Sequence, residues 1–263
     1  MNSIFQDIKI TLHQANFSTV DMKWSKKVFP YPHYRIYYVT DGEATLILND
    51  RKLKLSKGHV YLIPAFSLVE AICQDSMSHY FIHFQLISNF NNNIFEMYNP
   101  NLIVESQKNT IELFKNIIEN YENKNIFSEF ISMGSFNLLL APFFKGIKEL
   151  NSNMVKFSEV LSYIENNLTQ NVEIKTLAKL MNLNNVYFSN IFSKAFGLPP
   201  IQYIIKKRLE KAQLLLINSS AKIKDIALEC GFENNMYFSR VFHQKMSMTP
   251  EQYRKFYTNI MKV

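Results

Sequence analysis

The sequence of 263 residues has two cysteines, six glycines and a single tryptophan. Cys73 and Cys230 are far apart and stand in apolar surroundings, which argues against a disulfide framework or a cysteine metal site and favours a reducing cytoplasm. The first ten residues contain no basic flank that leads into an apolar run, so we expect no secretory signal. No stretch approaches the roughly 18 apolar residues of a membrane span, so we expect no membrane partner.

The charge is distributed unevenly along the chain. Residues 1–153 hold 14 Lys and Arg against 14 Asp and Glu, whereas residues 154–263 hold 15 against 8. The second part therefore carries the whole net charge of +7. A neutral part joined to a basic part favours a polyanion such as nucleic acid as the partner of the second, although a merely solvated basic face has the same composition.

Short segments rich in β-branched and aromatic residues follow one another from about residue 5 to residue 87. Turn signals separate them. Asp41-Gly42 predicts a hairpin between the segments on either side, and Asn49-Asp50 and Lys57-Gly58 predict the next two turns. Many short strands at this spacing predict a sandwich or a barrel.

The pattern becomes helical after these strands. Apolar residues recur at helical spacing from Ile111 to Tyr121, and Phe130–Lys148 predicts a second, more apolar helix. These two helices could cover the β-structure or form the interface of a dimer. The polar segment 149–153 is the best candidate for a linker, and everything after it reads as helical. We therefore expect an α+β protein with domains at 1–150 and 154–263.

The second part contains an internal repeat. Ile174–Leu183 matches Ile223–Phe232 at an offset of 49 residues, and Tyr187–Phe192 matches Tyr237–Phe242 at an offset of 50. Such a repeat indicates one supersecondary unit that is used twice. A protein-binding helical solenoid is the alternative, but solenoids need about three or more repeats.

Each copy has the pattern of a helix, a tight turn and a second helix. Small residues, Ala178 and Ala227, stand where two helices must cross closely, and Asn182 and Gly231 are types that adopt the left-handed conformation of a sharp turn. Phenylalanines at helical spacing form the buried face of each second helix. The opposite face of each second helix is expected to enter a DNA major groove. It carries Asn185, Val186, Ser189 and Asn190 in the first copy, and Asn235, Met236, Ser239 and Arg240 in the second.

A third helix, predicted from Pro199 or Pro200 to about Ile217, separates the two copies. Its 17 or so residues would span roughly 26 Å, enough to hold two recognition helices about one DNA turn apart. Basic residues expected to contact phosphates lie on this helix and near the ends of the recognition helices: Lys206, Lys207, Arg208, Lys211, Lys194 and Lys245. Arg208 could instead be engaged inside the domain.

From Ile174 to Phe256 the sequence resembles the DNA-binding domain of AraC/XylS-type transcription regulators. The shared pattern is Tyr187, Ser189, Phe192, Phe196-Gly197, Pro200, Tyr203, Arg208-Leu209, Ala212, Leu215-Leu216, Ile223, Ile226-Ala227, Gly231-Phe232, Tyr237–Arg240, Phe242, Thr249-Pro250 and Tyr253-Arg254. The resemblance implies two helix-turn-helix units joined by a linker helix. It also implies that the exposed early residues of each second helix read bases, with Arg240 as a base or phosphate contact. The sequence departs from the family at Ser247, where many relatives have glycine, and in the first recognition helix, which has no Arg or Gln.

The N-terminal part resembles, more loosely, the cupin-like β-barrel that serves this family as a sensor and dimerisation domain. The match rests on the strand rhythm, on Tyr38-Val39-x-x-Gly42 and on Gly58 with Ile63-Pro64. The usual cupin metal ligands are missing, because His33 has no His-x-His partner, so we expect no metal and no cofactor. The residues expected to line an effector pocket are His33, Arg35, Tyr37, His79 and His83. An inward Arg35 would favour an anionic or polyhydroxylated effector, and the family suggests a sugar or another small metabolite.

Together these features predict a transcription regulator, expected to act as an activator in the cytoplasm and not as an enzyme. Its expected partners are double-stranded promoter DNA, RNA polymerase, a small-molecule effector and a second copy bound through the helices around residues 106–148. Two other interpretations stay open. A cupin-type enzyme with a helical appendage would need a bound metal, and a DNA-bound scaffold without an effector would not respond to any metabolite.

Overall fold

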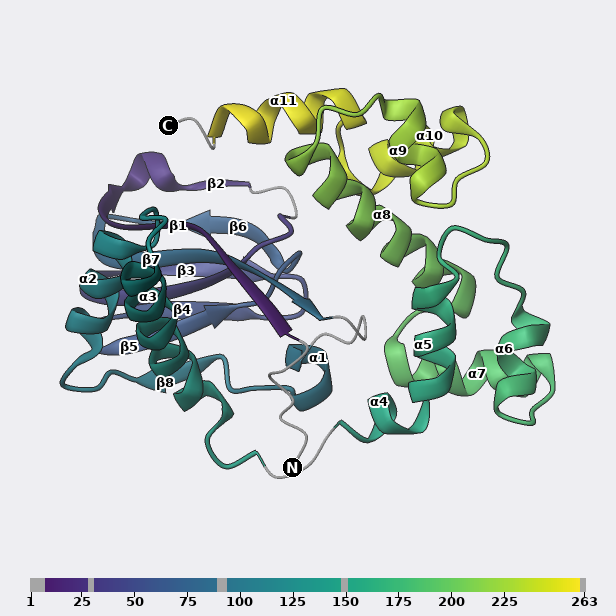
Figure 1. The fold of residues 1–263 in the computed structure, drawn as a ribbon, viewed down its shortest axis with the longest axis horizontal. Helices are drawn as coiled ribbons and strands as arrows, with labels where there is room; N and C mark the ends of the chain where they lie inside the picture. The colour runs from purple at the N-terminus through teal and green to yellow at the C-terminus, as the bar shows by residue number, and fades with distance from the viewer. Residues whose placement is uncertain (1–7, 28–30, 89–93, 148–150, 261–263) are drawn as a thin grey trace. The chain divides into compact units, whose positions relative to one another are not determined.

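The computed structural model describes residues 8–27, 31–88, 94–147 and 151–260 (Figure 1). The chain forms two compact units, residues 1–150 and 151–263. The boundary falls within the segment 149–153 that the sequence suggested as a linker; its first two residues lie outside the described residues, and its last two already belong to a helix.

Unit 1 is a β-structure with helices at its end. Its elements are β1 (Ile8–Asp21), the 3-10 helix η2 (Met22–Trp24), β2 (Lys26–Lys27), β3 (Tyr34–Leu48), β4 (Lys52–Ser56), β5 (His59–Ile63), β6 (Leu68–Ile72), β7 (Ser76–Ser88), α1 (Ile94–Tyr98), β8 (Ile103–Glu105), α2 (Thr110–Asn120), α3 (Ile126–Leu140) and η3 (Ala141–Phe144). The turns predicted at Asn49-Asp50 and Lys57-Gly58 are confirmed, because β3, β4 and β5 are separated there.

The long strand β3 belongs to two sheets. Its first half pairs with β7 and β5 in one antiparallel sheet of the order β1-β7-β3-β5-β8. Its second half pairs with β4 and β6 in the other sheet, where β6 also pairs with β2. Among the described strands no ladder joins β1 to β8, so the sheets do not close into the barrel that the sequence suggested. The arrangement is two sheets that share a strand.

The hairpin predicted at Asp41-Gly42 is wrong, because β3 runs straight through these two residues. The pairing of β3 with β7 shifts register between Val39 and Asp41, as it does at a β-bulge. Gly42 has a φ of +70° and lies so close to the carbonyl oxygen of Ser76 that a Cβ would overlap it. The turn-like dipeptide therefore marks the place where β3 passes from one sheet to the other.

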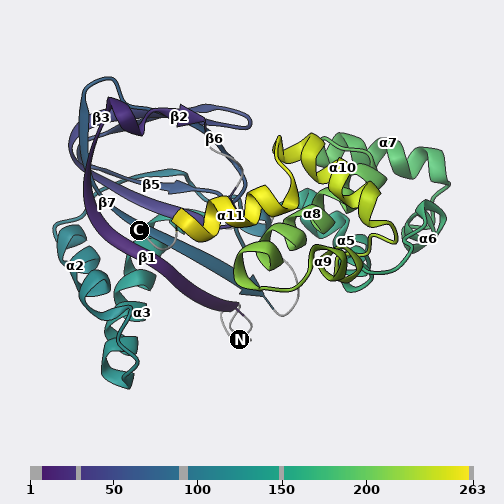
Figure 2. The same ribbon diagram turned by 90° about the horizontal axis from the view of Figure 1, so that it is seen from above.

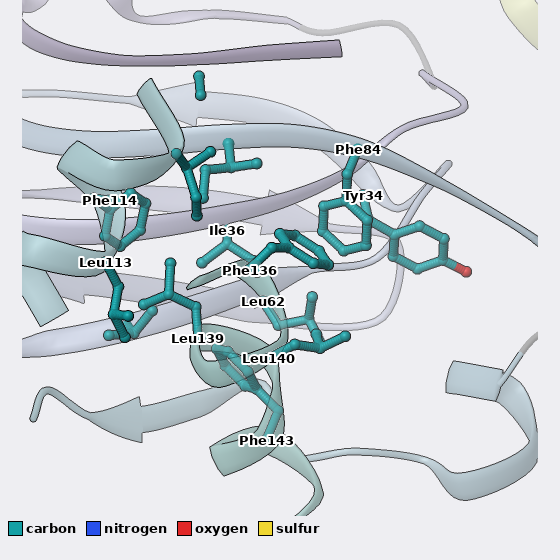
Figure 3. Packing of buried hydrophobic residues seen from close by; sticks show 14 of the residues in the cluster. Tyr34, Ile36, Leu62, Phe84, Leu113, Phe114, Phe136, Leu139, Leu140 and Phe143 are labelled. Atoms are coloured by element: carbon teal, nitrogen blue, oxygen red, sulfur yellow. The ribbon is translucent and has the colours of Figure 1, made fainter. Parts of the chain in front are cut away.

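Side chains of β3 alternate between two hydrophobic cores. Tyr34 and Ile36 pack with Phe84 of β7 against α2 and α3, whereas Tyr37 and Val39 face the second sheet (Figure 3). Because both faces of this strand are covered, its sequence reads as a nearly continuous apolar run. Polar residues at odd positions, such as Arg35, consequently lie between the two sheets.

Helices α2 and α3 lie together on one face of the first sheet (Figures 1 and 2). Helix α2 matches its prediction to within a residue, but α3 begins four residues before the predicted start at Phe130 and ends at Leu140. Pro142 stands in η3, where the α-helix has ended. By length and composition alone, residues 126–144 could cross a membrane, which corrects the expectation that no stretch approaches a membrane span.

Unit 2 is entirely helical in its described residues, as predicted. Its elements are α4 (Ser152–Lys156), α5 (Ser158–Asn166), α6 (Ile174–Leu180), α7 (Asn185–Phe196), α8 (Pro200–Asn218), α9 (Ile223–Glu229), α10 (Asn235–Met246) and α11 (Pro250–Ile260). We call α6 and α7 the first helix pair, and α9 and α10 the second helix pair.

The two helix pairs have the same turn. Asn182 and Gly231 both have positive φ angles, 56° and 83°, as the sequence predicts. In each pair the residue after the turn, Leu183 or Phe232, donates its backbone N–H at 2.9 Å to the carbonyl oxygen five residues earlier, that of Ala178 or Ala227. Both alanines are buried, so the helices can cross closely.

The repeat extends into the helix that follows each pair. Tyr203 of α8 meets Phe192 edge-on at a ring distance of 5.3 Å, and Tyr253 of α11 meets Phe242 edge-on at the same distance. Each pair therefore has its own aromatic core, and α8 reaches both, since its Gln213 donates to the hydroxyl of Tyr253 at 2.9 Å. The 19 residues of α8 span about 28 Å.

Candidate nucleic-acid interface and interior ligand site

Helices α7 and α10 begin with the same cap. The side-chain oxygen of Asn184 accepts a hydrogen bond from the N–H of Tyr187 at 2.9 Å, and that of Asn234 accepts from Met236 and Tyr237 at 2.8 and 3.1 Å. Asparagine is among the best residues at this position because it satisfies N–H groups that the helix leaves unpaired. The sequence analysis missed these caps, although both asparagines occupy equivalent places in the repeat.

The predicted readers of the first copy lie on the outer face of α7. Asn185, Val186 and Asn190 are exposed, and Val186 exposes 72% of its surface. Ser189 is half-buried and its hydroxyl donates to the carbonyl oxygen of Asn185 at 2.8 Å, which leaves only its lone pairs for an external donor. Tyr187, not among the predicted readers, exposes 54% of its surface on this helix.

The outer face of α10 is richer in hydrogen-bond donors. Asn235, Met236 and Arg240 are exposed and Ser239 is half-buried. The guanidinium of Arg240 lies 5.5 Å from the ring centre of Tyr237, a cation–π contact that restrains the side chain while its N–H groups stay exposed. Phe188 and Phe238, by contrast, are fully buried in the two aromatic cores.

The basic cluster of α8 is largely engaged inside the domain. Lys207 has only 12% of its side chain exposed and forms ion pairs with Glu165 at 3.7 Å and Glu210 at 3.6 Å. Lys206 pairs with Glu210 at 3.7 Å with half of its side chain in solvent, and Lys211 donates to the carbonyl oxygen of Glu229 at 2.8 Å. These residues were expected to contact phosphates, but only Lys206 keeps a substantially exposed ammonium.

Arg208 also has partners within unit 2, as the alternative from the sequence allowed. Its Nε donates to the carbonyl oxygen of Leu168 at 2.8 Å and its Nη2 to that of Gln170 at 2.6 Å. Burial lowers the pKa of its guanidinium. We therefore remove Arg208 from the set of expected phosphate contacts. Lys194 and Lys245, in the last turns of α7 and α10, are both exposed.

In unit 1 the strand register brings the predicted pocket residues together. Arg35 of β3 is directly opposite His83 of β7, and the ring of Tyr37 lies 5.0 Å from that of His79. His33 is fully buried just before β3, and His79 and Arg35 are also buried, at 3% and 6% exposure. All five predicted residues therefore belong to one cluster in the interior between the sheets.

The cluster contains aromatic residues that the sequence analysis missed. His13 of β1 stacks on His33 with ring centres 3.8 Å apart, and Tyr31 lies edge-on to His33 at 4.5 Å. The Arg35 guanidinium lies 5.4 Å from the ring centre of Tyr31. His13 enters the cluster through a register shift in the β1–β7 pairing between Leu12 and Gln14, which no sequence pattern signals.

Burial keeps the imidazoles of the cluster neutral. It lowers the pKa of His33 to about 3, with further contributions from His13 and Arg35, and it lowers the pKa of His79 to about 4. The pKa of His83 is held well below its ordinary value by burial and then by the charge of Arg35. Arg35 is thus the one cation of this cluster at neutral pH, and no carboxylate of the described residues forms an ion pair with it.

Several polar atoms of the cluster have no hydrogen-bond partner among the described residues: Nδ1 and Nε2 of His33, and Nδ1 of His79. Buried polar groups are rarely left unpaired, so these atoms point to an occupant that accepts and donates hydrogen bonds. No group of three or more His, Cys, Asp or Glu residues with the geometry of a metal site occurs within the described ranges.

Comparisons with known proteins match this geometry. A family model described as a helix-turn-helix domain matches residues 177–255, which include α7 and α10. The Msm operon regulatory protein of Streptococcus mutans is 25% identical over 243 residues, 86% of each chain. The melibiose operon regulatory protein of Escherichia coli is 33% identical over 98 residues, which are 37% of this chain but only 32% of that protein.

The whole chain also resembles a solved structure. The crystal structure of ToxT from Vibrio cholerae O395 has a TM-score of 0.60 and 18% sequence identity, and the match covers 96% of this chain and 99% of that one. This likeness concerns the fold, a β-rich unit followed by a helical one.

The fold and the matches define a class of protein: a helix-turn-helix transcription regulator that binds DNA, and not an enzyme. The resemblance of the sequence to AraC/XylS-type regulators falls on the residues that this helix-turn-helix model matches.

Proposed function

We propose that this protein binds promoter DNA with both helix pairs of unit 2 and regulates transcription in response to a small molecule held in unit 1. The observation that carries the DNA-binding proposal is the repetition of one local structure: two capped helices, α7 and α10, with buried aromatic faces and exposed polar faces. On a duplex, α7 and α10 enter successive major grooves, with α8 as the spacer between them.

The two recognition helices contribute unequally. An exposed arginine gives α10 a donor pair for a guanine edge, whereas α7 offers Asn185 and Asn190 for adenine edges and Val186 for a thymine methyl group. Lys194 and Lys245 contact phosphates at the far ends of these helices, and Lys206 can add a third phosphate contact. The second helix pair therefore supplies more of the sequence specificity.

The experiment that tests this proposal is selection of binding sites from random duplex DNA by the full chain. The expected result is a two-part site whose halves are about one helical turn apart, each half bound by one helix pair. The Arg240→Ala variant should lose the preference in one half and retain it in the other. Enrichment of no sequence, or of a single short half-site, would contradict the use of both pairs.

The effector proposal rests on the interior cluster of unit 1. A buried guanidinium without a carboxylate partner favours an anion, and the unpartnered nitrogens of His33 and His79 can bond further polar groups of the same ligand. Relatives offer two precedents: a regulator of a melibiose operon, and ToxT, which has been crystallised with a bound unsaturated fatty acid. The chemistry of Arg35 favours a carboxylate or phosphate over a neutral sugar.

A second copy of the chain is the proposed partner of α3. Ile126, Phe127, Phe130 and Leu138 on this helix expose between 58% and 74% of their surfaces, and Ile111 of α2 adds 40%. A concentration of large apolar side chains on one exposed helix is typical of a protein interface. The symmetric pairing of two such faces would make the protein a homodimer through α2 and α3.

The two units are proposed to adopt one arrangement that can bind DNA and another that cannot. The effector shifts the population between these two arrangements. The activated dimer acts on promoters in the cytoplasm and recruits RNA polymerase. A scaffold without an effector is the competing interpretation, and it requires that no small molecule change either thermal stability or DNA affinity.

A further inference from the structure

Arg208 lies at the junction of the two helix pairs. It projects from α8 towards the loop between α5 and α6, where it donates to the carbonyl oxygens of Leu168 and Gln170. On its other side the guanidinium lies 5.8 Å from the ring centre of Phe232, the residue that follows the turn of the second helix pair. One side chain thus contacts the loop that leads into the first pair and the turn within the second.

The backbones of the two pairs also meet at this junction. Gly231 approaches the carbonyl oxygen of Leu168 so closely that a Cβ on residue 231 would overlap it. A cleft of about 250 Å³ lies beside this contact. Gln170 and Asn171 line it on the side of the first pair, and Glu233 and Tyr237 line it on the side of the second. Glycine is therefore required at position 231 for its φ of +83° and for the close approach of the loop.

We infer that Arg208 and Gly231 are positioning residues that fix the spacing and angle between the two recognition helices, and thereby determine which half-site separation the protein accepts. This inference rests on the proposed use of both pairs on one duplex. The physical reason is that a single helix such as α8 restrains its two ends only loosely against twist and bending, whereas a charge-assisted contact to two carbonyl groups holds the loop against the turn.

The role is distinct from that of the neighbouring lysines. Lys207 forms ion pairs with Glu165 of α5 and with Glu210 of its own helix, and Lys211 donates a hydrogen bond to the carbonyl oxygen of Glu229 of α9. Each of these joins α8 to one side of the junction. Arg208 reaches both sides, and its planar guanidinium can serve two carbonyl acceptors at once, which a lysine ammonium on the same stem does less well.

The first test measures the junction without DNA. Spin labels are placed on the full chain at exposed positions of the two pairs, Lys179→Cys in α6 and Lys224→Cys in α9, and the distance distribution is measured by pulsed electron resonance. The native chain should give one narrow distribution. Arg208→Ala should broaden the distance distribution, and Arg208→Lys should broaden it less. Gly231→Ala should shift the mean distance.

The matched control is Lys206→Ala, which removes a basic side chain of α8 that does not reach the junction. Its distribution should equal that of the native chain, and circular dichroism should show that all variants keep their helix content. A narrow, unmoved distribution in both Arg208→Ala and Gly231→Ala would overturn the inference. If Arg208→Ala does not fold, the Arg208→Lys and Gly231→Ala variants decide the question.

The second test uses the selected two-part site with one base pair inserted between its halves. The native chain should lose affinity on the order of tenfold, because one recognition helix then meets the wrong groove position. Arg208→Ala should bind the native site more weakly but lose much less on insertion. Failure of the native chain to select any DNA would refute the proposed function and leave the spin-label result intact, so the two failures are distinguishable.

Discussion

Ser247 takes at the end of α10 the same left-handed conformation that Gly197 takes at the end of α7, with φ angles of 55° and 71°. Both residues donate their backbone N–H to the carbonyl oxygen four residues earlier, that of His243 and Ser193 respectively. Many members of the resembled family have glycine at this position, as the sequence analysis noted. The turn is preserved, and the serine is held in a conformation that costs a non-glycine residue about 1 kcal/mol or more.

Ser247→Gly should therefore stabilise the protein. We expect an increase of about 1 kcal/mol in the free energy of unfolding, reduced somewhat by the greater freedom of glycine in the unfolded chain. The measurement is denaturant unfolding followed by circular dichroism at 222 nm. Ser193→Gly, in the interior of α7, serves as the control and should destabilise; a Ser247→Gly variant that is less stable than the native chain would contradict the strain argument.

Arg240→Ala should weaken binding to the selected DNA site by about 1–3 kcal/mol while leaving binding to unrelated DNA almost unchanged, because a base contact is lost. Lys245→Ala should weaken both kinds of binding alike and reduce the slope of log affinity against log salt concentration by about one. Fluorescence anisotropy with labelled duplexes at several salt concentrations measures both effects. Lys255→Ala, an exposed lysine of α11, is the control; equal losses on both DNAs for Arg240→Ala would make Arg240 a phosphate contact.

Arg35→Met should not destabilise the ligand-free protein and should remove its response to anions. The reason is that the substitution replaces a buried cation, which has no carboxylate partner among the described residues, with an apolar chain of similar length. Thermal unfolding with a panel of small carboxylates and sugar phosphates measures the response, with Arg51→Met, at an exposed arginine, as control. A fall of several degrees in the Tm of ligand-free Arg35→Met would show that Arg35 supports the fold and not a ligand.

Acid should destabilise unit 1 before it affects unit 2. The folded pKa values of His33 and His79, about 3 and 4, lie below the unfolded value of about 6.5, so their neutral forms contribute stability above pH 6.5 that is lost as the pH falls towards 4. Each histidine should lower the free energy of unfolding by about 2 kcal/mol between pH 7 and pH 5. Trp24, the only tryptophan, lies 6.0 Å from His79 and reports the unfolding of unit 1 by fluorescence.

The control for this prediction is His79→Gln, which removes one titrating group. It should reduce the slope of unfolding free energy against pH by about 1.4 kcal/mol per pH unit between pH 6 and pH 5. A slope equal to that of the native chain would mean that His79 can be protonated in the folded state.

Phe130→Glu should convert a dimer to a monomer. A carboxylate in the centre of the apolar face of α3 would be buried without a partner in the proposed interface, whereas in the monomer it is exposed to solvent. Light scattering coupled to size-exclusion chromatography measures the mass. Met22→Glu is the matched control, because Met22 is an exposed apolar residue of another element, at 68% exposure. A native chain that is monomeric at high concentration would refute the dimer proposal.

The sequence by itself determined the helical repeat, because its signals are local. Backbone sterics favour a left-handed residue at Asn182 and Gly231. The periodicity of the sequence over a few helical turns places the alanines and phenylalanines on the buried face. The two turns and the two aromatic cores consequently form as predicted. Most of the predicted readers on α7 and α10 are exposed for the same reason, since they lie opposite the buried faces; Ser189 and Ser239 are half-buried.

Only the tertiary structure decided where the charged and strand residues are used. Asp41-Gly42 has the composition of a hairpin, but pairing with β7 draws it into a continuous strand, and composition carries no information about that partner. Arg208 reads as a phosphate contact, yet two carbonyl oxygens 40 and 38 residues away in the chain take up its donors. Arg35 is turned inward by the register of β3 between two sheets, and a register is fixed by packing on both faces at once.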